Sequence, residues 1–265
     1  MKHNPLVSVL MTSYNREKYI GEAIESVLNQ SYKNFELIIV DDCSSDKTVD
    51  IAKKYQLIDN RVKVYINDKN VGDYPNRNIA ASYATGKYLK YLDSDDIMYS
   101  YCLDVMVNAM ENYPEAAFGL SSIDEERTFP ILITPSEIYK EAFFTDRNHF
   151  SRGPGSSIIR RDVFNEIGGF IEERHIGDTD MWLKLAQQFC MVKFQFSVYW
   201  NRIHPHTESN IENHNLVIKK IRKKLFFSYL KSENCPLSKT EIKKVIINFR
   251  RKRLFSFLYF IRKMV

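Results

Sequence analysis

Short apolar runs separated by segments with helical spacing dominate the first hundred positions of the chain. Runs of five to seven residues, bounded by polar clusters, are typical of buried strands. The pattern predicts four strands, at Val7–Ser13, Phe35–Val40, Val62–Ile66 and Tyr88–Leu92.

The segments between these runs repeat their apolar residues every three or four positions, as helices do. Helices are expected over Arg16–Gln30, after a capping cluster at Ser44–Asp46, and over Asn76–Ala84, with Gly86 able to end the third one. Strands that alternate with helices imply parallel crossovers. The predicted fold class is therefore α/β, a Rossmann-like, mostly parallel sheet with helices on both faces.

Polar side chains follow the predicted strands directly. Tyr14 comes after the first strand, Asp41 and Asp42 close the second, and Asp93 and Asp95 follow the fourth. Ligands of parallel sheets bind beyond the carboxyl ends of the strands. We therefore expect these residues to gather along one edge of the sheet.

The second half of the chain is less regular. Prolines punctuate Ile123–Pro154, which predicts a loop-rich segment over a site. Further elements are expected as a helix over Asp178–Phe189, strands over Met191–Phe196 and Val198–Ile203, and two basic, aromatic-rich helices over Asn213–Lys231 and Ser238–Arg262. The predicted division is a catalytic domain over residues 1–210 and a basic helical tail over residues 211–265.

The tail changes the picture given by the net charge of +5, because residues 211–265 alone carry +12 and residues 1–210 carry −7. A basic patch confined to one end favours an anionic surface over nucleic acid. Two alternatives stay open. In the first, the tail forms interfacial helices on anionic lipid. In the second, its apolar faces pack on protein, either the catalytic domain or a second subunit in a homodimer. No secretory signal or spanning segment is evident, so the expected location is cytoplasmic, peripheral to the inner face of the membrane if the tail binds lipid.

The cluster LDSDD carries the chemistry most directly. Asp93 and Asp95, one residue apart at a strand end, can converge on a hard divalent cation, Mn²⁺ or Mg²⁺, with diphosphate oxygens and water as further ligands. A DxD alone is weak evidence for a metal site, because most Asp-rich turns are solvated loops. Asp42 can accept the imide N–H of uracil or thymine, or can cap a helix. Tyr14 can stack on a base, or can belong to the core.

Arg77 lies at the start of a predicted helix, where it and the free N–H groups could bind a diphosphate, although a surface arginine is the competing interpretation. Ser94, between the two acids of the DxD, is assigned to the nucleotide as well. The assembled pattern resembles the inverting glycosyltransferases of family 2, which have the GT-A fold. The matching stretches are SVLMTSYNREKYI, ELIIVDDCSSDKT, NVGDYPNRNIAASYATGKYLKYLDSDD, GSSIIRRDVFNEIGGF and GDTDMWLKL.

This resemblance implies roles residue by residue. Thr12 and Tyr14 would border the nucleobase, Asp42 would bind its edge with Asp41 beside it, Arg77 would lie near the nucleotide, Asp93 and Asp95 would bind the metal, and Asp178 would be the catalytic base. His204 matches a position where relatives often have a histidine near the metal. Two alternatives are that His204 is a loop histidine without that role, or that His206 has the role instead.

One departure concerns the base, because Gly177 stands where members often have an acid, which leaves Asp180 as an alternative to Asp178. Asp178 and Trp182 are one helical turn apart and share a face, whereas Asp180 points elsewhere. This spacing favours Asp178.

The resemblance implies transfer of a sugar from a nucleotide diphosphate, with UDP favoured, to the hydroxyl of a glycan or lipid-linked acceptor in polysaccharide or lipopolysaccharide synthesis. A sugar nucleotidyltransferase is a competing function, but it usually has a Gly-rich loop after the first strand, and TSYNREKY has no glycine. An inactive nucleotide-sensing or scaffold protein would be expected to lose the DxD or the later aspartate, and both are present.

Overall fold

The computed structural model describes residues 4–122, 128–145, 147, 149–195, 198–204 and 216–249. Several predictions lie outside these residues: the end of the strand at Phe196, the alternative ligand His206, the first residues of the tail and its last part from Arg250 onward. The proposed domain boundary at residue 210 also falls in a stretch that is not described.

The first half of the chain is built from three strand–helix units and a fourth strand. The strands are β1 (Val7–Ser13), β2 (Phe35–Asp41), β3 (Val62–Ile66) and β4 (Tyr88–Asp93), and the helices are α1 (Ile20–Leu28), α2 (Thr48–Ile58) and α3 (Asp73–Ser82). All four predicted strands are confirmed within one residue. The apolar runs of β1, β2 and β4 are almost wholly buried, whereas β3 at the sheet edge is only partly buried. Helix α3 begins three residues before the predicted start.

Eight strands form the central sheet, in the order β3-β2-β1-β4-β8-β6-β9-β7. The second half contributes β6 (Ala116–Ser122), β7 (Ile131–Ile133), β8 (Ser157–Arg160) and β9 (Cys190–Gln195). Strands β3, β2, β1 and β4 run parallel, as do β6 and β9, whereas β8 and β7 pair antiparallel to their neighbours. The mostly parallel α/β sheet predicted from the sequence is therefore confirmed. A second, two-stranded sheet joins β5 (Ile97–Met98) to β10 (Tyr199–Trp200).

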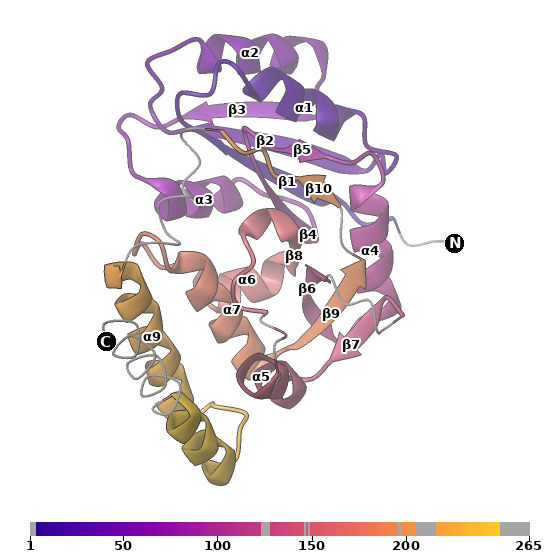
Figure 1. The fold of residues 1–265 in the computed structure, drawn as a ribbon. Coiled ribbons are helices and arrows are strands. Elements are labelled where there is room, and N and C mark those ends of the chain that lie inside the picture. Colours follow the sequence, from indigo (N-terminus) through magenta and orange to yellow (C-terminus); the bar gives the residue numbers. More distant parts are fainter. Residues whose placement is uncertain are drawn as a thin grey trace, which may run out of the picture.

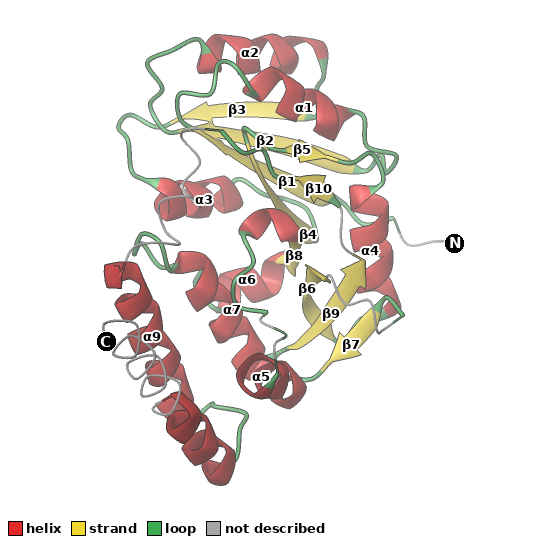
Figure 2. Cartoon of the chain, viewed as in Figure 1, coloured by secondary structure: helices red, strands yellow, loops and turns green. Residues whose placement is uncertain are grey.

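Helices cover both faces of the sheet, with α1 and α2 above it in Figure 1 and α3 and α7 below. Residues of α1, α2 and α4 (Cys102–Asn112) share one buried cluster with the sheet. The opposite cluster takes residues from α3, α5 (Pro135–Phe144), α6 (Arg161–Glu166) and α7 (Gly177–Gln188). Figure 2 shows the same layering of helices around strands.

The loop-rich expectation for Ile123–Pro154 is wrong for residues 131–144, which form β7 and α5. Pro135 occupies the first turn of α5, where a missing N–H costs nothing, and Thr134 forms a capping box with Glu137. Prolines that indicated a loop therefore mark a helix start. The strand expected over Val198–Ile203 is also shorter, since only Tyr199–Trp200 pair with β5.

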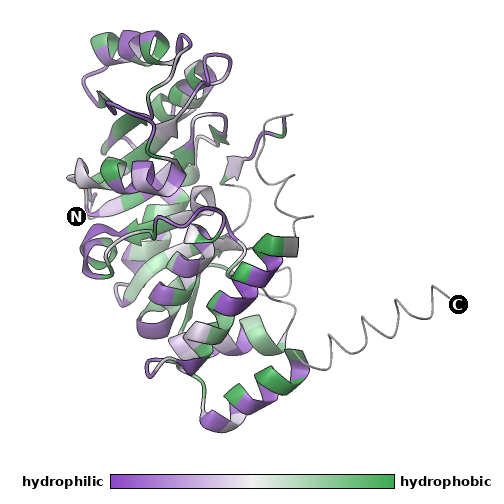
Figure 3. Ribbon diagram, turned by 90° about the vertical axis from the view of Figure 1, so that its left-hand side faces the viewer, coloured by the Kyte–Doolittle hydropathy of each residue, from purple (hydrophilic) through white to green (hydrophobic). Residues whose placement is uncertain are grey.

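Helix α9 (Leu216–Lys231) packs on the catalytic domain beside α7 (Figure 1). Leu230 is buried in the same core cluster as α7, and Phe226 packs against that cluster. Hydrophilic and hydrophobic residues alternate along the helix (Figure 3). The hydrophobic residues Phe226 and Leu230 pack on the rest of the described chain, in agreement with one of the two alternatives for the tail. Residues 239–249 form a further helical segment. No helix among the described residues combines the length and the apolar character needed to cross a bilayer.

Candidate active site

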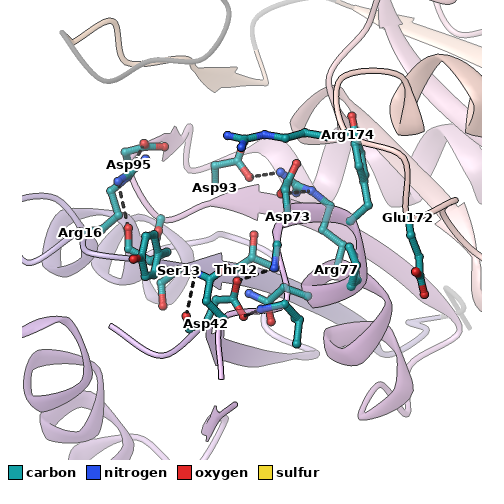
Figure 4. Close-up of a pocket in the computed structure, with 18 of the residues that line it drawn as sticks. Thr12, Ser13, Arg16, Asp42, Asp73, Arg77, Asp93, Asp95, Glu172 and Arg174 are labelled. Carbon is teal, nitrogen blue, oxygen red and sulfur yellow. Dashed lines mark hydrogen bonds and ion pairs between the residues drawn. The ribbon is translucent and has the colours of Figure 1, made fainter. Parts of the chain in front are cut away.

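A cavity of about 580 Å³ lies at the carboxyl ends of β1, β2 and β4, closed by the start of α3 (Figure 4). Segments far apart in sequence meet there. The lining residues are Thr12, Ser13, Tyr14, Arg16, Asp42, Asn70, Val71, Gly72, Asp73, Tyr74, Pro75, Asn76, Arg77, Asp93, Ser94, Asp95, Glu172, Arg174, Asn201 and Arg202. Seven predicted site residues are thus brought together: Thr12, Tyr14, Asp42, Arg77, Asp93, Ser94 and Asp95.

Asp42 lies at one end of this cavity and is 4% exposed. Its carboxylate accepts hydrogen bonds from the backbone N–H groups of Val71 at 2.8 Å and Gly72 at 2.9 Å, and from the Asn67 amide at 2.9 Å. Gly72 has a φ of +91°, which a residue with a side chain rarely adopts, and it sits directly before α3. The carboxylate therefore fixes the loop that leads into α3.

The neighbouring Asp41 has a different environment. It is buried and does not line the cavity. Its carboxylate accepts hydrogen bonds from the hydroxyls of Ser13 at 2.8 Å and Ser44 at 2.6 Å, and from the Ser44 N–H at 2.7 Å. Asp41 thus holds the turn after β2 against β1, and it supports the cavity wall from behind.

Arg77 projects from the second turn of α3 and is 4% exposed. Its Nη2 lies 2.6 Å from Asp93 Oδ1, and its Nε lies 2.9 Å from Asp73 Oδ1. Burial by itself would lower the pKa of the guanidinium, but the charges of Asp73 and Asp93 outweigh burial and raise it. Arg77 is therefore a fixed cation at the edge of the cavity, beside the first acid of the DxD.

Asp95, the second acid of the DxD, contacts one arginine and one histidine. Asp95 Oδ2 lies 2.8 Å from Arg16 Nε and 3.0 Å from His204 Nε2. The His204 ring stacks on Tyr19, with ring centroids 5.0 Å apart, and this contact fixes the imidazole. The structure thus confirms that the histidine lies beside the DxD, but its binding to a metal stays a prediction.

The side chains at this point carry oxygen and nitrogen atoms of the kinds that bind divalent cations. Carboxylate oxygens of Asp93 and Asp95 and an imidazole nitrogen of His204 suit Mn²⁺ or Mg²⁺. Within the described ranges, no group of three or more His, Cys, Asp and Glu side chains forms a metal site by itself. An ion there would need further ligands from a bound nucleotide and water.

Asp96, which the sequence did not single out, organises the opposite wall. It is buried, and its carboxylate accepts hydrogen bonds from the Asn201 amide at 3.2 Å and from the Arg202 N–H at 3.0 Å. Burial and, next, the charge of Asp93 raise the pKa of Asp96 to about 7. Through these contacts Asn201 and Arg202 reach the cavity from far along the chain.

Asp178 is the second residue of α7, and it does not line the cavity itself. Its Oδ1 accepts a hydrogen bond from the Thr179 N–H at 2.6 Å. The cavity residue Tyr74 lies next to it: a Cβ on Gly177 would come within 2.7 Å of the Tyr74 ring. Burial and then the charge of Asp178 raise the pKa of the Tyr74 hydroxyl. Asp178 is thus half-buried beside Tyr74, a residue that lines the cavity.

The alternative base, Asp180, faces away from the cavity. It is 4% exposed, accepts a hydrogen bond from the Tyr229 hydroxyl at 2.7 Å, and lies 3.4 Å from Lys184 Nζ. Its partners are therefore α9 and the next turn of α7.

The sequence analysis missed five charged lining residues: Arg16, Asp73, Glu172, Arg174 and Arg202. Both Arg16 and Asp73 lie inside stretches that carried the resemblance. Arg16 also follows β1 closely, which was a usable signal, whereas Asp73 begins α3 and follows no strand directly. Glu172 and Arg174 lie in a polar loop without periodicity, and no sequence signal marks them.

The family profile described as Glycosyl transferase family 2 matches residues 8–168, well over half of the chain. The chain belongs to this family. It is therefore a glycosyltransferase, and membership favours sugar transfer over nucleotidyl transfer. A glycosyltransferase of Methanocaldococcus jannaschii is 30% identical over 235 residues, covering 85% of this chain and 77% of the relative.

Two further relatives carry more specific names. A GalNAc(5)-diNAcBac-PP-undecaprenol beta-1,3-glucosyltransferase of Campylobacter jejuni is 31% identical over 192 residues, which cover 69% of this chain and 60% of the relative. A UDP-Glc:alpha-D-GlcNAc-diphosphoundecaprenol beta-1,3-glucosyltransferase of Escherichia coli is 42% identical over 105 residues, 40% of this chain and 41% of the relative.

Solved structures share the GT-A fold with this family member. Residues 1–349 of S. aureus TarS, in complex with UDP-GlcNAc, have a TM-score of 0.66 at 22% identity, covering 92% of this chain and 71% of that TarS chain. The mannosyltransferase PcManGT from Pyrobaculum calidifontis, in complex with GDP-Man and Mn²⁺, has a TM-score of 0.65 at 16% identity, covering 86% and 64%. At these identities the likeness concerns the fold.

Proposed function

We propose that this glycosyltransferase moves a sugar from a UDP-sugar to an acceptor hydroxyl with inversion at the anomeric carbon, assisted by Mn²⁺ or Mg²⁺. One observation carries the proposal: Asp42, Arg77, Asp93 and Asp95, from two strand ends and a helix, converge on one cavity of about 580 Å³. Cavities of this size and position suit a nucleotide sugar.

The nucleoside end of the donor is assigned to the part of the cavity near Asp42. Tyr14 is 47% exposed and offers a ring face on which a base can stack. Asp42 would accept the imide N–H of uracil, with Thr12 beside it. Structures of the same fold bind UDP-GlcNAc and GDP-Man, which supports a nucleotide sugar in this cavity. Thymine would meet Asp42 equally well, so the preference for uracil rests on the family resemblance.

The diphosphate is assigned to Arg77, Ser94 and the DxD. A divalent ion held by Asp93 and Asp95, with His204 beside them, would stabilise the departing diphosphate as a Lewis acid. Arg77 supplies a buried positive charge that needs no reorganisation, since Asp73 and Asp93 already hold its guanidinium. Arg16, on Asp95, adds a second cation that could shift toward the phosphates.

Asp178 is assigned as the general base. Its carboxylate would take the proton of the acceptor hydroxyl while the oxygen bonds to the anomeric carbon and the bond to the diphosphate breaks on the opposite side. A single displacement of this kind inverts the anomeric configuration. Proton transfer by a positioned carboxylate typically contributes about 100- to 10,000-fold in rate.

The acceptor is proposed to be a lipid-linked glycan in cell-surface polysaccharide or lipopolysaccharide synthesis. Two relatives are named for diphosphoundecaprenol-linked acceptors, which supports this class. The reaction would then take place at the cytoplasmic face of a membrane, with the basic tail against anionic lipid. A homodimer formed through the tail is the second candidate for that surface.

The deciding experiment compares Asp178→Asn with Asp180→Asn. UDP release from UDP-glucose would be measured with diphosphoundecaprenol-linked GlcNAc and Mn²⁺, and UDP affinity by calorimetry. We expect Asp178→Asn to lower transfer by about 100-fold or more while UDP affinity stays within twofold. Asp180→Asn, the same change two residues on, should lose far less.

Three results would count against the proposal. Full transfer by Asp178→Asn removes that residue from the mechanism, and a larger loss in Asp180→Asn reverses the assignment. A wild-type protein that uses neither UDP-glucose, UDP-GlcNAc nor GDP-mannose would contradict the proposed donor class.

A further inference from the structure

We propose that Tyr229 and Arg222 of α9 are positioning residues that clamp the start of α7, and with it Asp178, against the cavity wall. This deepens the proposed function and rests on it in one respect, the role of Asp178 as the base. The clamp acts on a short segment, residues 175–180, which lies between α9 on one side and Tyr74 on the other.

The first contact is a hydrogen bond from the Tyr229 hydroxyl to Asp180 Oδ1 at 2.7 Å. Asp180 is buried, so the loss of this donor would leave its carboxylate with one fewer partner away from water. Its own N–H donates to the Ile176 carbonyl at 2.8 Å, which makes Asp180 part of the first turn of α7. Tyr229 thus grips the turn that contains Asp178.

The second contact is made by Arg222, whose Nη2 donates to the His175 carbonyl at 3.1 Å. His175 has a φ of +70°, a left-handed conformation that is unfavourable for a residue with a side chain. Such a conformation persists only where surrounding contacts enforce it. Arg222 therefore holds the sharp bend that sends the chain into α7.

Both contacts come from one face of one helix. Residues 222 and 229 are seven positions apart, about two helical turns, so their side chains lie on the same side of α9. The helix is anchored independently of either side chain, because Leu230 is 1% exposed in the core and the Gln187 amide donates to the Tyr229 carbonyl at 3.0 Å. Removing the Tyr229 hydroxyl would therefore leave α9 in place and remove only its hydrogen bond to the start of α7.

The opposite side of the segment meets the cavity. The Tyr74 ring lies against Gly177, and Glu172 and Arg174, just upstream, line the cavity. The family profile ends at residue 168, so both the clamped segment and α9 lie beyond it. A part of the chain outside the profile therefore sets the position of the residues that would meet the acceptor.

The test compares Tyr229→Phe with Tyr139→Phe. Tyr139 is the matched control, because its buried hydroxyl also donates to α7, to the Leu183 carbonyl at 3.2 Å, but further along the helix. We expect Tyr229→Phe to lower kcat for transfer about 10-fold with the donor KM and UDP affinity unchanged, since a small misplacement of a catalytic group is costly. Tyr139→Phe should keep kcat within about twofold.

Amide hydrogen exchange gives a readout that needs no acceptor. Exchange over residues 176–182 should be at least about fivefold faster in Tyr229→Phe than in the wild type or in Tyr139→Phe. Arg222→Gln provides a second variant, expected to show the same loss in kcat alone and faster exchange around residue 175.

The outcomes separate the clamp from the proposed function. Equal losses of kcat in Tyr229→Phe and Tyr139→Phe, or wild-type kcat and exchange in Tyr229→Phe, would overturn the clamp. An inactive wild-type protein would overturn the proposed function, while faster exchange confined to Tyr229→Phe and Arg222→Gln would still support the clamp.

Discussion

Three acidic residues that follow β4 differ in what holds them. Asp93 pairs with the buried Arg77, Asp95 contacts Arg16 and His204, and Asp96 binds backbone and amide N–H groups of residues 201–202. Only the first two project into the cavity. The acid that follows the DxD, Asp96, therefore shapes the wall and leaves Asp93 and Asp95 to face a ligand in the cavity.

Removal of the Asp95 carboxylate should weaken metal-dependent nucleotide binding. In Asp95→Ala we expect UDP affinity in the presence of Mn²⁺ to fall about 10- to 100-fold, toward the value of the wild type in EDTA, because a direct ligand of the ion is lost. Calorimetry of both proteins with and without EDTA measures this. Asp50→Ala, on the exposed side of α2, is the control. An Asp95→Ala protein that keeps the full gain from Mn²⁺ would contradict the assignment.

Sequence reasoning predicted the position of the site at the residue scale because carboxyl ends of parallel strands meet at one edge. Asp42, Asp93 and Asp95 could therefore be gathered without a structure. Glu172 and Arg174 could not be assigned in this way, since they lie in a loop between two helices that follows no strand end. Asp41 and Asp42 are adjacent and look equivalent in sequence, but only Asp42 lines the cavity. The carboxylate of Asp41 instead binds Ser13 and Ser44 in the turn after β2, which the sequence could not predict.

The start of α7 is tightly packed against α3. Its first residue, Gly177, packs directly under the Tyr74 ring, and an added Cβ would come within 2.7 Å of three ring carbons. Neither side can easily give way, because Tyr74 is 7% exposed and the segment is gripped by α9. The absence of a side chain at this position is therefore what lets α3 and α7 meet.

Gly177→Ala should accordingly destabilise the protein by about 1 to 3 kcal/mol, the usual cost of overpacking a buried contact, and should lower transfer as well. Gly21→Ala in α1 is the matched control: a Cβ there meets its nearest atom, Tyr55 Oη, at an ordinary 3.5 Å. That variant should be neutral or up to about 1 kcal/mol more stable, because alanine favours a helix. Urea unfolding measures both, and equal stability of the two variants would refute the contact argument.

At this scale the sequence predicted elements with a clear period and missed elements that depend on tertiary contacts. Strands β1 and β3 matched their predicted bounds, since every residue of β1 carries an apolar or small side chain. Strand β8 has only four residues and is inserted antiparallel between β4 and β6, and no local pattern announces such pairing. Helix α5 escapes sequence reasoning for a different reason: its proline, Pro135, indicates a loop by residue type but lies in the first helical turn.

For the whole molecule, the charge asymmetry becomes more specific once α9 is placed. Its apolar face packs on the catalytic domain, so an anionic surface would meet the other face. A second cavity, of about 590 Å³, lies there and is lined by Lys220, Lys223, Lys224, Phe227, Ser228 and Lys231. Four lysines around one aromatic ring suit lipid headgroups better than a partner's apolar surface.

Vesicle binding should therefore depend on these lysines and not on net charge alone. Lys220→Glu with Lys224→Glu should reduce partitioning to phosphatidylglycerol vesicles at least about 10-fold, since each basic residue at a membrane surface contributes about 1 kcal/mol. Lys53→Glu with Lys54→Glu, on α2, changes the formal net charge equally, from +5 to +1, and should bind like the wild type. Co-sedimentation measures both, and equal loss or equal retention would argue against a membrane-facing α9.

The grip of α9 on residues 175 and 180 also bears on how such enzymes could be recombined. A chimaera that joined the nucleotide-binding half of this chain to the tail of another transferase would break two hydrogen bonds across the junction. A graft point upstream of residue 170 would keep the loop before α7, α7 itself and α9 together in one fragment. Such a fragment would also carry Asn201, Arg202 and His204, so the nucleotide cavity would be assembled from both parent proteins.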